Sequence, residues 1–95
     1  MRFEWDQSKH RANRRKHGVG FAEAMRVFAD AAALSKIDPR FDDGRWTTRG
    51  SADGRIFLVA HTYHEAKDDE HEEVIRIISA RYATAAERRV YHGSR

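Results

Sequence analysis

Two apolar runs in the C-terminal half of the chain place the strongest constraint on its fold: "RIFLVAHTY" at residues 55–63 and "EVIRIISAR" at residues 73–81. In both runs, apolar side chains occupy odd and even positions alike, which is typical of strands that are covered on both faces. We therefore predict that these runs are central strands of one sheet. The acidic segment between them, residues 64–73, is predicted to be a plain hairpin loop.

The N-terminal third of the chain predicts a short strand followed by two helices. "RFEWD" has the alternation of a short strand, and Asp6 is a good N-cap for a helix that ends near His17, before Gly18. Residues 20–30 predict a second helix with one apolar face facing the core, formed at positions i, i+3, i+4 and i+7 by Phe21, Ala24, Met25 and Phe28.

Further strands are predicted at residues 32–38 and 45–50, and a final helix follows the second apolar run. Thr84 and Glu87 form a capping box for that helix. The order predicts an α+β fold: an antiparallel sheet of about four strands, two N-terminal helices and a C-terminal helix, with the helices against one face. The length of 95 residues predicts a single domain, residues 1–95.

Composition excludes several classes of site. The chain has no cysteine, so disulfides and cysteine-based zinc sites are excluded. No apolar run reaches the roughly 18 residues of a membrane span and no signal-peptide pattern is present, so we expect a cytoplasmic protein. We predict no cofactor and no metal site, because His61 and His64, three residues apart in a strand, point to opposite faces, although His71 follows them.

The charges are segregated although the net charge is only +3. Residues 1–28 hold seven Lys or Arg against three acids, and residues 76–95 hold five Arg against one acid, whereas residues 64–73 hold six acids against one Lys. A basic face suits phosphates, and the alternative is a plain solvated surface. The first helix contains a single apolar residue, Ala12, so it either contacts an anion or is simply very soluble.

The chain resembles the BrnT toxins of type II toxin–antitoxin systems from Phe3 to about Tyr91. The residues that carry the resemblance occur in this order: "FEWD", Lys9, Asn13, "KHG" at 16–18, Phe21, Ala24, "IRIISAR", Ala83-Thr84, Glu87-Arg88 and Tyr91. The resemblance implies a RelE-like fold and a ribonuclease that cleaves RNA without a metal and stops translation. It also implies a BrnA-like antitoxin in a 2:2 complex, which represses its own operon and binds operator DNA only through the antitoxin.

Metal-free RNA cleavage needs a base for the 2′-OH, cations for the phosphorane and an acid for the 5′-oxygen. Our candidate catalytic residues are Lys9, Lys16, His17, Arg76 and Arg81. The arginines would hold a phosphate, and in an ideal strand they would point to opposite faces. The lysines would supply charge or a base, and His17 would shuttle protons. The alternatives are solvated lysines, a helix-end histidine bonded to the last carbonyls, and structural salt bridges for Arg76 and Arg81, such as one from Arg81 to Glu87.

Three further residues are predicted to contact RNA: Asn13, Arg88 and Tyr91. Asn13 could instead fix the first helix, and Arg88 and Tyr91, three residues apart, could pack the last helix onto the sheet rather than stack on bases. The competing function is a non-catalytic basic module that acts mainly as a corepressor with its antitoxin. The sequence lacks a recognisable DNA-reading helix motif, so direct operator recognition by this chain is not expected.

Overall fold

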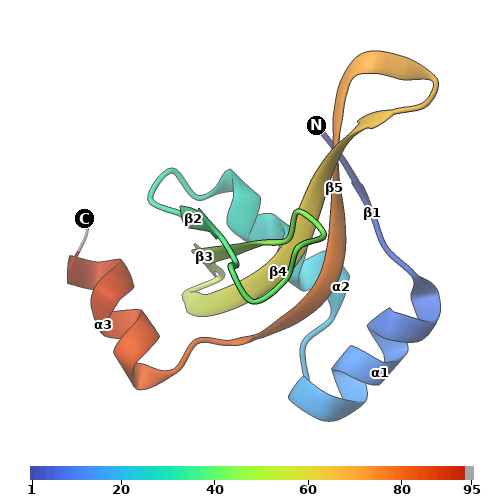
Figure 1. Ribbon diagram of the computed structural model, residues 1–95. Helices are drawn as coiled ribbons and strands as arrows, with labels where there is room; N and C mark the ends of the chain where they lie inside the picture. Colours follow the sequence, from blue (N-terminus) through green and yellow to red (C-terminus); the bar gives the residue numbers. More distant parts are fainter. Residues whose placement is uncertain (94–95) are drawn as a thin grey trace.

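A five-stranded sheet in the order β1-β5-β4-β3-β2 organises the computed structural model, which describes residues 1–93 and, except at residue 70, their side chains (Figure 1). The two apolar runs form the long strands β4 and β5, and the remaining predicted strands are also present. The strands are β1 (Arg2–Glu4), β2 (Leu34–Ile37), β3 (Trp46–Ala52), β4 (Arg55–Ala66) and β5 (Asp69–Tyr82).

The sheet is mixed, and the prediction of an antiparallel sheet of about four strands was wrong in this respect. β1 runs parallel to β5, with Arg2 beside Val74 and Glu4 beside Arg76, whereas the other three strand pairs are antiparallel. Parallel neighbours need a long connection between them, and here the connection comprises most of the chain. The alternation of side chains within a strand carries no information about the direction of its neighbour.

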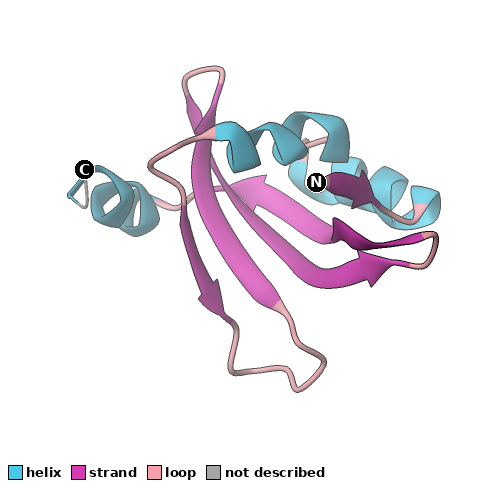
Figure 2. Cartoon of the chain, turned by 90° about the horizontal axis from the view of Figure 1, so that it is seen from above, coloured by secondary structure: helices cyan, strands magenta, loops and turns pink. Residues whose placement is uncertain are grey.

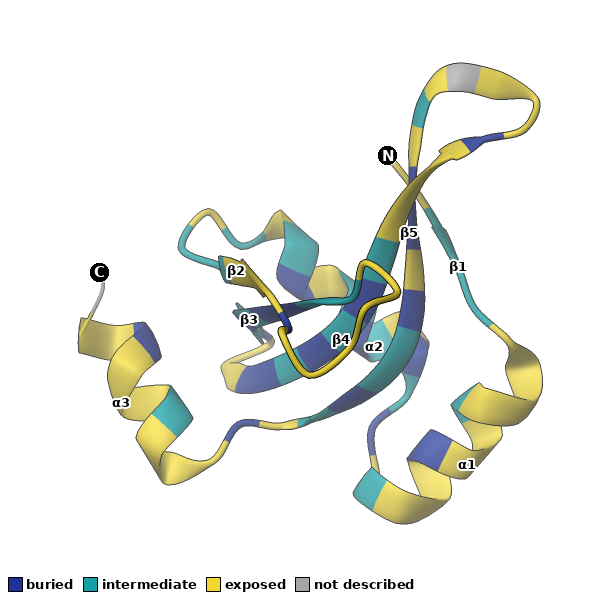
Figure 3. Ribbon diagram, viewed as in Figure 1, coloured by how far each residue is buried: buried dark blue, intermediate teal, exposed yellow. Residues whose placement is uncertain are grey.

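The first helix, α1 (Gln7–His17), has the ends that the sequence predicts. A side-chain oxygen of Asp6 accepts hydrogen bonds from the backbone N–H groups of Ser8 at 2.8 Å and Lys9 at 3.1 Å. Gly18 follows the helix with φ of 71°, a left-handed conformation that glycine adopts without steric cost. Both ends of α1 are thus capped, and Asn13 is its one buried residue (Figure 3).

The second helix is shorter than predicted. It is α-helical only in α2 (Phe21–Ala24) and continues as the 3-10 turn η1 (Met25–Ala29). Gly20 supplies no side-chain cap, and Val27 and Phe28 have lower helix propensity, so burial holds this segment more than helical hydrogen bonds do. Its predicted apolar face is present: Phe21 and Ala24 are fully buried, and Met25 and Phe28 pack against the same core.

The core lies between one face of the sheet and the segment α2–η1 (Figure 2). Phe57 and Val59 of β4 and Ile75 and Ile77 of β5 contribute from the sheet. The opposite face, which we call the open face, carries α3 (Ala85–Gly93) at one end, where Tyr91 clusters with Ile56 and Ala83. The prediction that the helices lie against one face of the sheet was therefore wrong. No helix among the described residues is long and apolar enough to cross a membrane.

The acidic segment 64–73 is mostly strand, so the prediction of a plain loop was wrong. β4 continues to Ala66 and β5 begins at Asp69, and the two strands form a hairpin arm that extends past the rest of the sheet (Figure 1). Val74 is buried at its base and Ala66 is buried beside the turn at its tip. Ion pairs to the N-terminal residues also hold it, including one between Arg2 and Asp68 at 3.0 Å.

A bulge in β5 brings the two strand arginines to the same face. Arg76 lies opposite Thr62 and Arg81 lies opposite Leu58, and the register shifts between Ala60 and His61. Residues directly opposite in an antiparallel pair point to the same side, and residues 58 and 62 of β4 share the open face. The expectation that Arg76 and Arg81 point to opposite faces was therefore wrong, because it assumed an ideal strand.

Candidate functional site

The open face carries a row of side chains that alternates apolar and basic across four strands. The strand pairings place Leu34 of β2, Arg49 of β3, Leu58 of β4 and Arg81 of β5 side by side. Neighbouring strands lie about 4.8 Å apart, so the backbones of the two arginines are separated by roughly 10 Å. Long guanidinium side chains from both positions can therefore reach a single phosphate group.

A hollow of about 320 Å³, which we call the basic cleft, lies over this row. Its lining residues are Lys36, Asp38, Pro39, Arg40, Thr47, Arg49, Leu58, Arg81 and Glu87. Four of these nine residues are Lys or Arg and two are acidic. A concave site with an excess of guanidinium and ammonium groups suits a phosphate-bearing ligand.

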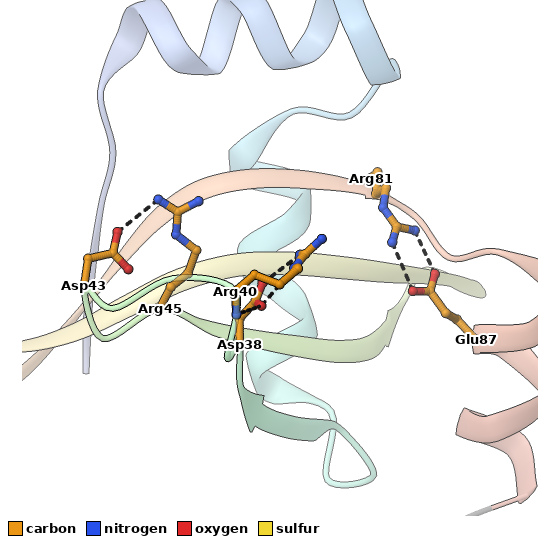
Figure 4. Close-up of polar contacts among 6 residues, drawn as sticks. All are labelled: Asp38, Arg40, Asp43, Arg45, Arg81 and Glu87. Carbon is orange, nitrogen blue, oxygen red and sulfur yellow. Dashed lines mark hydrogen bonds and ion pairs between the residues drawn. The ribbon is translucent and has the colours of Figure 1, made fainter.

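Arg81 is held at the end of the cleft by Glu87. Its Nη1 and Nη2 atoms donate to the two carboxylate oxygens of Glu87 at 2.7 and 3.0 Å (Figure 4). The same carboxylate accepts a bond from the backbone N–H of Thr84 at 2.8 Å, and the Thr84 hydroxyl accepts from the N–H of Glu87. The predicted capping box and the alternative Arg81–Glu87 salt bridge are both confirmed. The hydrogen bond from Arg81 lowers the pKa of Glu87 to about 2, so this carboxylate is ionised at neutral pH.

The loop between β2 and β3 forms the other side of the cleft. The Arg40 side chain donates two hydrogen bonds to Asp38, at 2.9 and 2.7 Å, and these lower the pKa of Asp38 to about 2 (Figure 4). Arg45 donates to Asp43, and its guanidinium lies 3.8 Å from the centre of the Phe41 ring. The loop is thus fixed by charged pairs, and Arg40 is close enough to Arg81 for the two cations to repel each other.

Arg49 differs from these arginines because its charge is not compensated. No other described residue forms a hydrogen bond or ion pair with its side chain, and its Nε atom is buried without a partner. Partial burial of a cation without a partner destabilises the fold unless a bound ligand supplies the missing hydrogen bonds. Our sequence reasoning missed Arg49. The sequence feature that could have identified it is its position in the predicted strand "RWTTRG", two residues after Thr47 and therefore on the same face of the sheet.

The predicted catalytic residues of α1 lie at the free edge of β5. Asn13 faces that edge, and around the helix Lys9 and Lys16 fall on one side of Asn13 while His10 and His17 fall on the other. His10 packs against the ring of Phe21, with 5.3 Å between centroids, so its side of α1 faces the core layer. Lys9 and Lys16 are exposed on the flank toward the open face, whereas His17 is half-buried on the flank toward α2. Neither lysine lines the basic cleft, and the structure places the lysines, but not His17, on the flank of α1 that is turned toward the open face.

Asn13 hydrogen-bonds to the free edge of β5 in the way that a neighbouring strand would. Its side-chain amide donates to the carbonyl of Ala80 at 2.8 Å and accepts from the N–H of Ala80 at 3.1 Å. It also donates to the carbonyl of Val19 at 2.9 Å. Both ends of the amide are used and the residue is 7% exposed. This placement corresponds to the alternative we gave for Asn13, that it fixes the helix, and it leaves Asn13 outside the open face.

The two RNA-binding candidates of α3 have different environments. Tyr91 is 2% exposed, and its hydroxyl donates to Asp30 at 2.5 Å, so it packs the helix against the sheet as in the alternative interpretation. Arg88 is exposed and uses only Nη1, which donates to the carbonyl of Ala83 at 3.0 Å. Of the pair, Arg88 keeps donors available for a ligand.

Arg76 lies near the base of the hairpin arm, about five residues along β5 from Arg81. It donates to Glu4 at 3.3 Å, and Glu4 also bonds His64 at 2.8 Å. The carbonyl of Glu65 and the carboxylate of Glu4 raise the pKa of His64, and the bond from His64 lowers the pKa of Glu4. At about 3.3 Å per residue, Arg76 is roughly 16 Å from Arg81, so it can contact a neighbouring phosphate rather than the same one.

Nothing in the described part of the chain gathers three or more His, Asp or Glu side chains into a possible metal site. A search of the curated proteins finds no match to the chain. The family model for BrnT, the ribonuclease toxin of a type II toxin–antitoxin system, matches residues 5–87. This match extends over most of the chain and includes every element from α1 to the capping box of α3. The chain therefore belongs to the BrnT family of ribonuclease toxins.

Proposed function

We propose that this protein is an endoribonuclease toxin that cleaves RNA in the basic cleft without a metal ion and thereby stops translation. The observation that carries the proposal is the unpaired guanidinium of Arg49 beside the positioned guanidinium of Arg81. The family match supports the reaction type. The RelE-like fold that the resemblance implies stays a prediction.

The scissile phosphate lies between Arg49 and Arg81. The 2′-oxygen attacks phosphorus, the bond to the 5′-oxygen breaks, and the products carry a 2′,3′-cyclic phosphate and a 5′-hydroxyl. The two guanidinium groups donate to the non-bridging oxygens, where negative charge increases in the transition state. Arg81 can do so while bound to Glu87, because a guanidinium has five N–H donors. This positive charge is what supports metal independence.

Lys9, Lys16 and Arg76 complete the proposed site. The two lysines lie on the flank of α1 toward the open face and supply proton transfer and additional charge. Arg76 binds the neighbouring phosphate. His17 remains a candidate for proton transfer only through a rearrangement of α1, because it faces the core layer. Arg88 contacts RNA beyond the cleft.

The test is cleavage of RNA in EDTA by the purified chain and its variants. We expect Arg49→Ala and Arg81→Ala to lower the cleavage rate about 100-fold, the usual effect of removing one donor to a developing oxyanion. Arg26→Ala is the matched control, because Arg26 also forms a two-bond pair with a carboxylate, Asp53, but belongs to η1 on the other face. We expect His17→Ala to retain activity.

Three results would contradict the proposal. Equal cleavage by all variants would place the chemistry elsewhere, and loss of cleavage in EDTA alone would show a metal requirement. An inactive wild-type chain that still binds its partner would support the non-catalytic corepressor instead.

The type II family implies a protein antitoxin. We further propose that it is BrnA-like, forms a 2:2 complex with this chain and carries the contacts to operator DNA. Induced expression of the chain alone should arrest translation in the cytoplasm, and coexpression of the antitoxin should relieve the arrest.

A further inference from the structure

A second hollow, of about 590 Å³, lies on the other side of α3 from the basic cleft. Its lining residues are Ser51, Gly54, Arg55, Ile56, Tyr82, Ala83, Arg88, Tyr91 and His92. The floor is apolar, because Ile56, Ala83 and Tyr91 form one buried cluster. Its volume is in the range of sites that enclose a small organic ligand.

The guanidinium groups of Arg55 and Arg88 make the rim of this hollow basic. Arg55, Arg88 and His92 are exposed there, and none of the lining residues is acidic. Arg55 donates to the hydroxyl of Tyr82 at 3.1 Å and forms a longer ion pair with Glu23 at 4.0 Å, and Arg88 donates to a backbone carbonyl at 3.0 Å. Each arginine keeps further N–H donors. An apolar floor below a basic rim matches a ligand with a flat apolar part and an anionic part.

One wall of the hollow is formed by the Tyr82 ring and the guanidinium group of Arg55. The rings of Phe57 and Tyr82 are stacked, with 5.2 Å between centroids and 28° between planes. The guanidinium carbon of Arg55 lies 5.8 Å from the centre of the Tyr82 ring. Aromatic rings and guanidinium planes are the surfaces on which unpaired RNA bases stack. The wall therefore suits a nucleobase better than an acidic peptide.

The hollow adjoins the basic cleft through consecutive residues. Arg81 lines the cleft and Tyr82 lines the hollow, and likewise Glu87 lines the cleft and Arg88 lines the hollow. Arg81 and Tyr82 point to opposite sides of β5, so an RNA strand meets both sites by passing around the end of β5 at the first turn of α3.

We propose that this hollow is a nucleotide pocket, which binds one nucleotide next to the cleaved phosphate. The base lies against Arg55, Tyr82 and the apolar floor, and Arg88 and His92 bind the phosphate. The binding of a nucleotide follows from the pocket itself, whereas its place next to the cleaved bond rests on the function proposed above.

The first experiment measures binding without cleavage. The ¹⁵N-labelled full chain is titrated with adenosine 5′-monophosphate and, separately, with inorganic phosphate, and amide shifts are recorded. We expect the nucleotide to shift residues of the pocket and to bind about tenfold more weakly to Tyr82→Leu, the usual effect of losing one stacking ring. Tyr63→Leu is the control, because Tyr63 is similarly exposed at the opposite end of β4. Equal shifts by phosphate alone, or equal nucleotide affinity of Tyr82→Leu, would overturn the pocket.

The second experiment separates this inference from the proposed function. In RNA cleavage, Tyr82→Leu should raise KM about tenfold with little change in kcat, whereas Arg49→Ala should lower kcat. Active enzyme with an unchanged KM in Tyr82→Leu and no nucleotide binding would refute the pocket and leave the ribonuclease proposal intact. Nucleotide binding by a chain that cleaves no RNA would support the pocket and refute the ribonuclease proposal.

Discussion

His61 is a residue whose protonation opposes the fold. It is fully buried, its Nε2 bonds the hydroxyl of Thr48 at 2.6 Å, and the rings of Phe28 and Tyr63 pack against it. Burial lowers the pKa of His61 to about 4, below the value near 6.5 of an unfolded histidine. The unfolded chain therefore binds a proton first as the pH falls. We expect the contribution of His61 to the free energy of unfolding to decline by about 3 kcal/mol between pH 6.5 and about pH 4. Urea unfolding at several pH values measures this decline.

A matched pair of variants assigns this loss of stability to His61. His61→Gln removes the titrating group and should flatten the pH profile between pH 6.5 and 4. His64→Gln should leave this window unchanged and alter the profile only above pH 6.5, because the stability that the raised pKa of His64 contributes is complete below the unfolded pKa. The stability that Asp38 and Glu87 contribute falls only below about pH 5, where the unfolded carboxylates take up protons, so the slope above pH 5 reports His61. A wild-type profile that is flat above pH 5, or a His61→Gln profile that falls as steeply as that of the wild type, would contradict the assignment.

At this scale the sequence predicts residues whose role is local and misses those whose role depends on a distant partner. The cap residues Asp6 and Thr84 act on backbone groups two or three positions away, so their roles are readable from spacing. Asn13 bonds Ala80, 67 positions along the chain, and no local pattern specifies that bond. Arg49 is informative because the structure leaves it unpaired, and a sequence cannot show the absence of a partner.

Among the elements, β3 and η1 approach each other so closely that only glycine fits between them. A Cβ atom added at Gly50 would lie 2.9 Å from the Cβ of Val27 and 3.1 Å from its carbonyl oxygen, so a rotamer change cannot relieve the contact. We expect Gly50→Ala to lower the free energy of unfolding by about 2 kcal/mol, as overpacking does elsewhere. Gly93→Ala, where a Cβ meets nothing within 4 Å, should be nearly neutral. Equal urea midpoints for the two variants would show that η1 moves away freely.

Element ends follow from the sequence here more reliably than element interiors. α1 ends as predicted, because Asp6 and Gly18 determine its backbone geometry directly. The second helix changes to η1 in its middle, where the packing of Val27 on the sheet takes precedence over helical periodicity. The acidic segment has the composition of a loop, yet it is part of the arm because its ends continue two paired strands.

At the scale of the molecule, the sequence predicts the basic character of the protein but not which cations share a face. One extra residue in β5 reverses the alternation between Arg76 and Arg81 and places both on the open face. The edge position of α1, set by Asn13, then divides Lys9 and Lys16 from His17. Bulges and helix placement depend on packing across the whole sheet, so the composition of the site became visible only in the structure.

The shared face has a consequence for how RNA binding depends on salt. For single strands, the logarithm of the affinity falls with the logarithm of the salt concentration by about 0.7 for each phosphate contact. With a fully 2′-O-methylated RNA, which binds but offers no 2′-OH for attack, we expect Arg49→Ala to reduce this slope by about 0.7. Arg26→Ala removes the same charge from the other face and should leave the slope unchanged. An equal reduction in both variants would mean that RNA responds to the overall charge of the protein rather than to contacts on the open face.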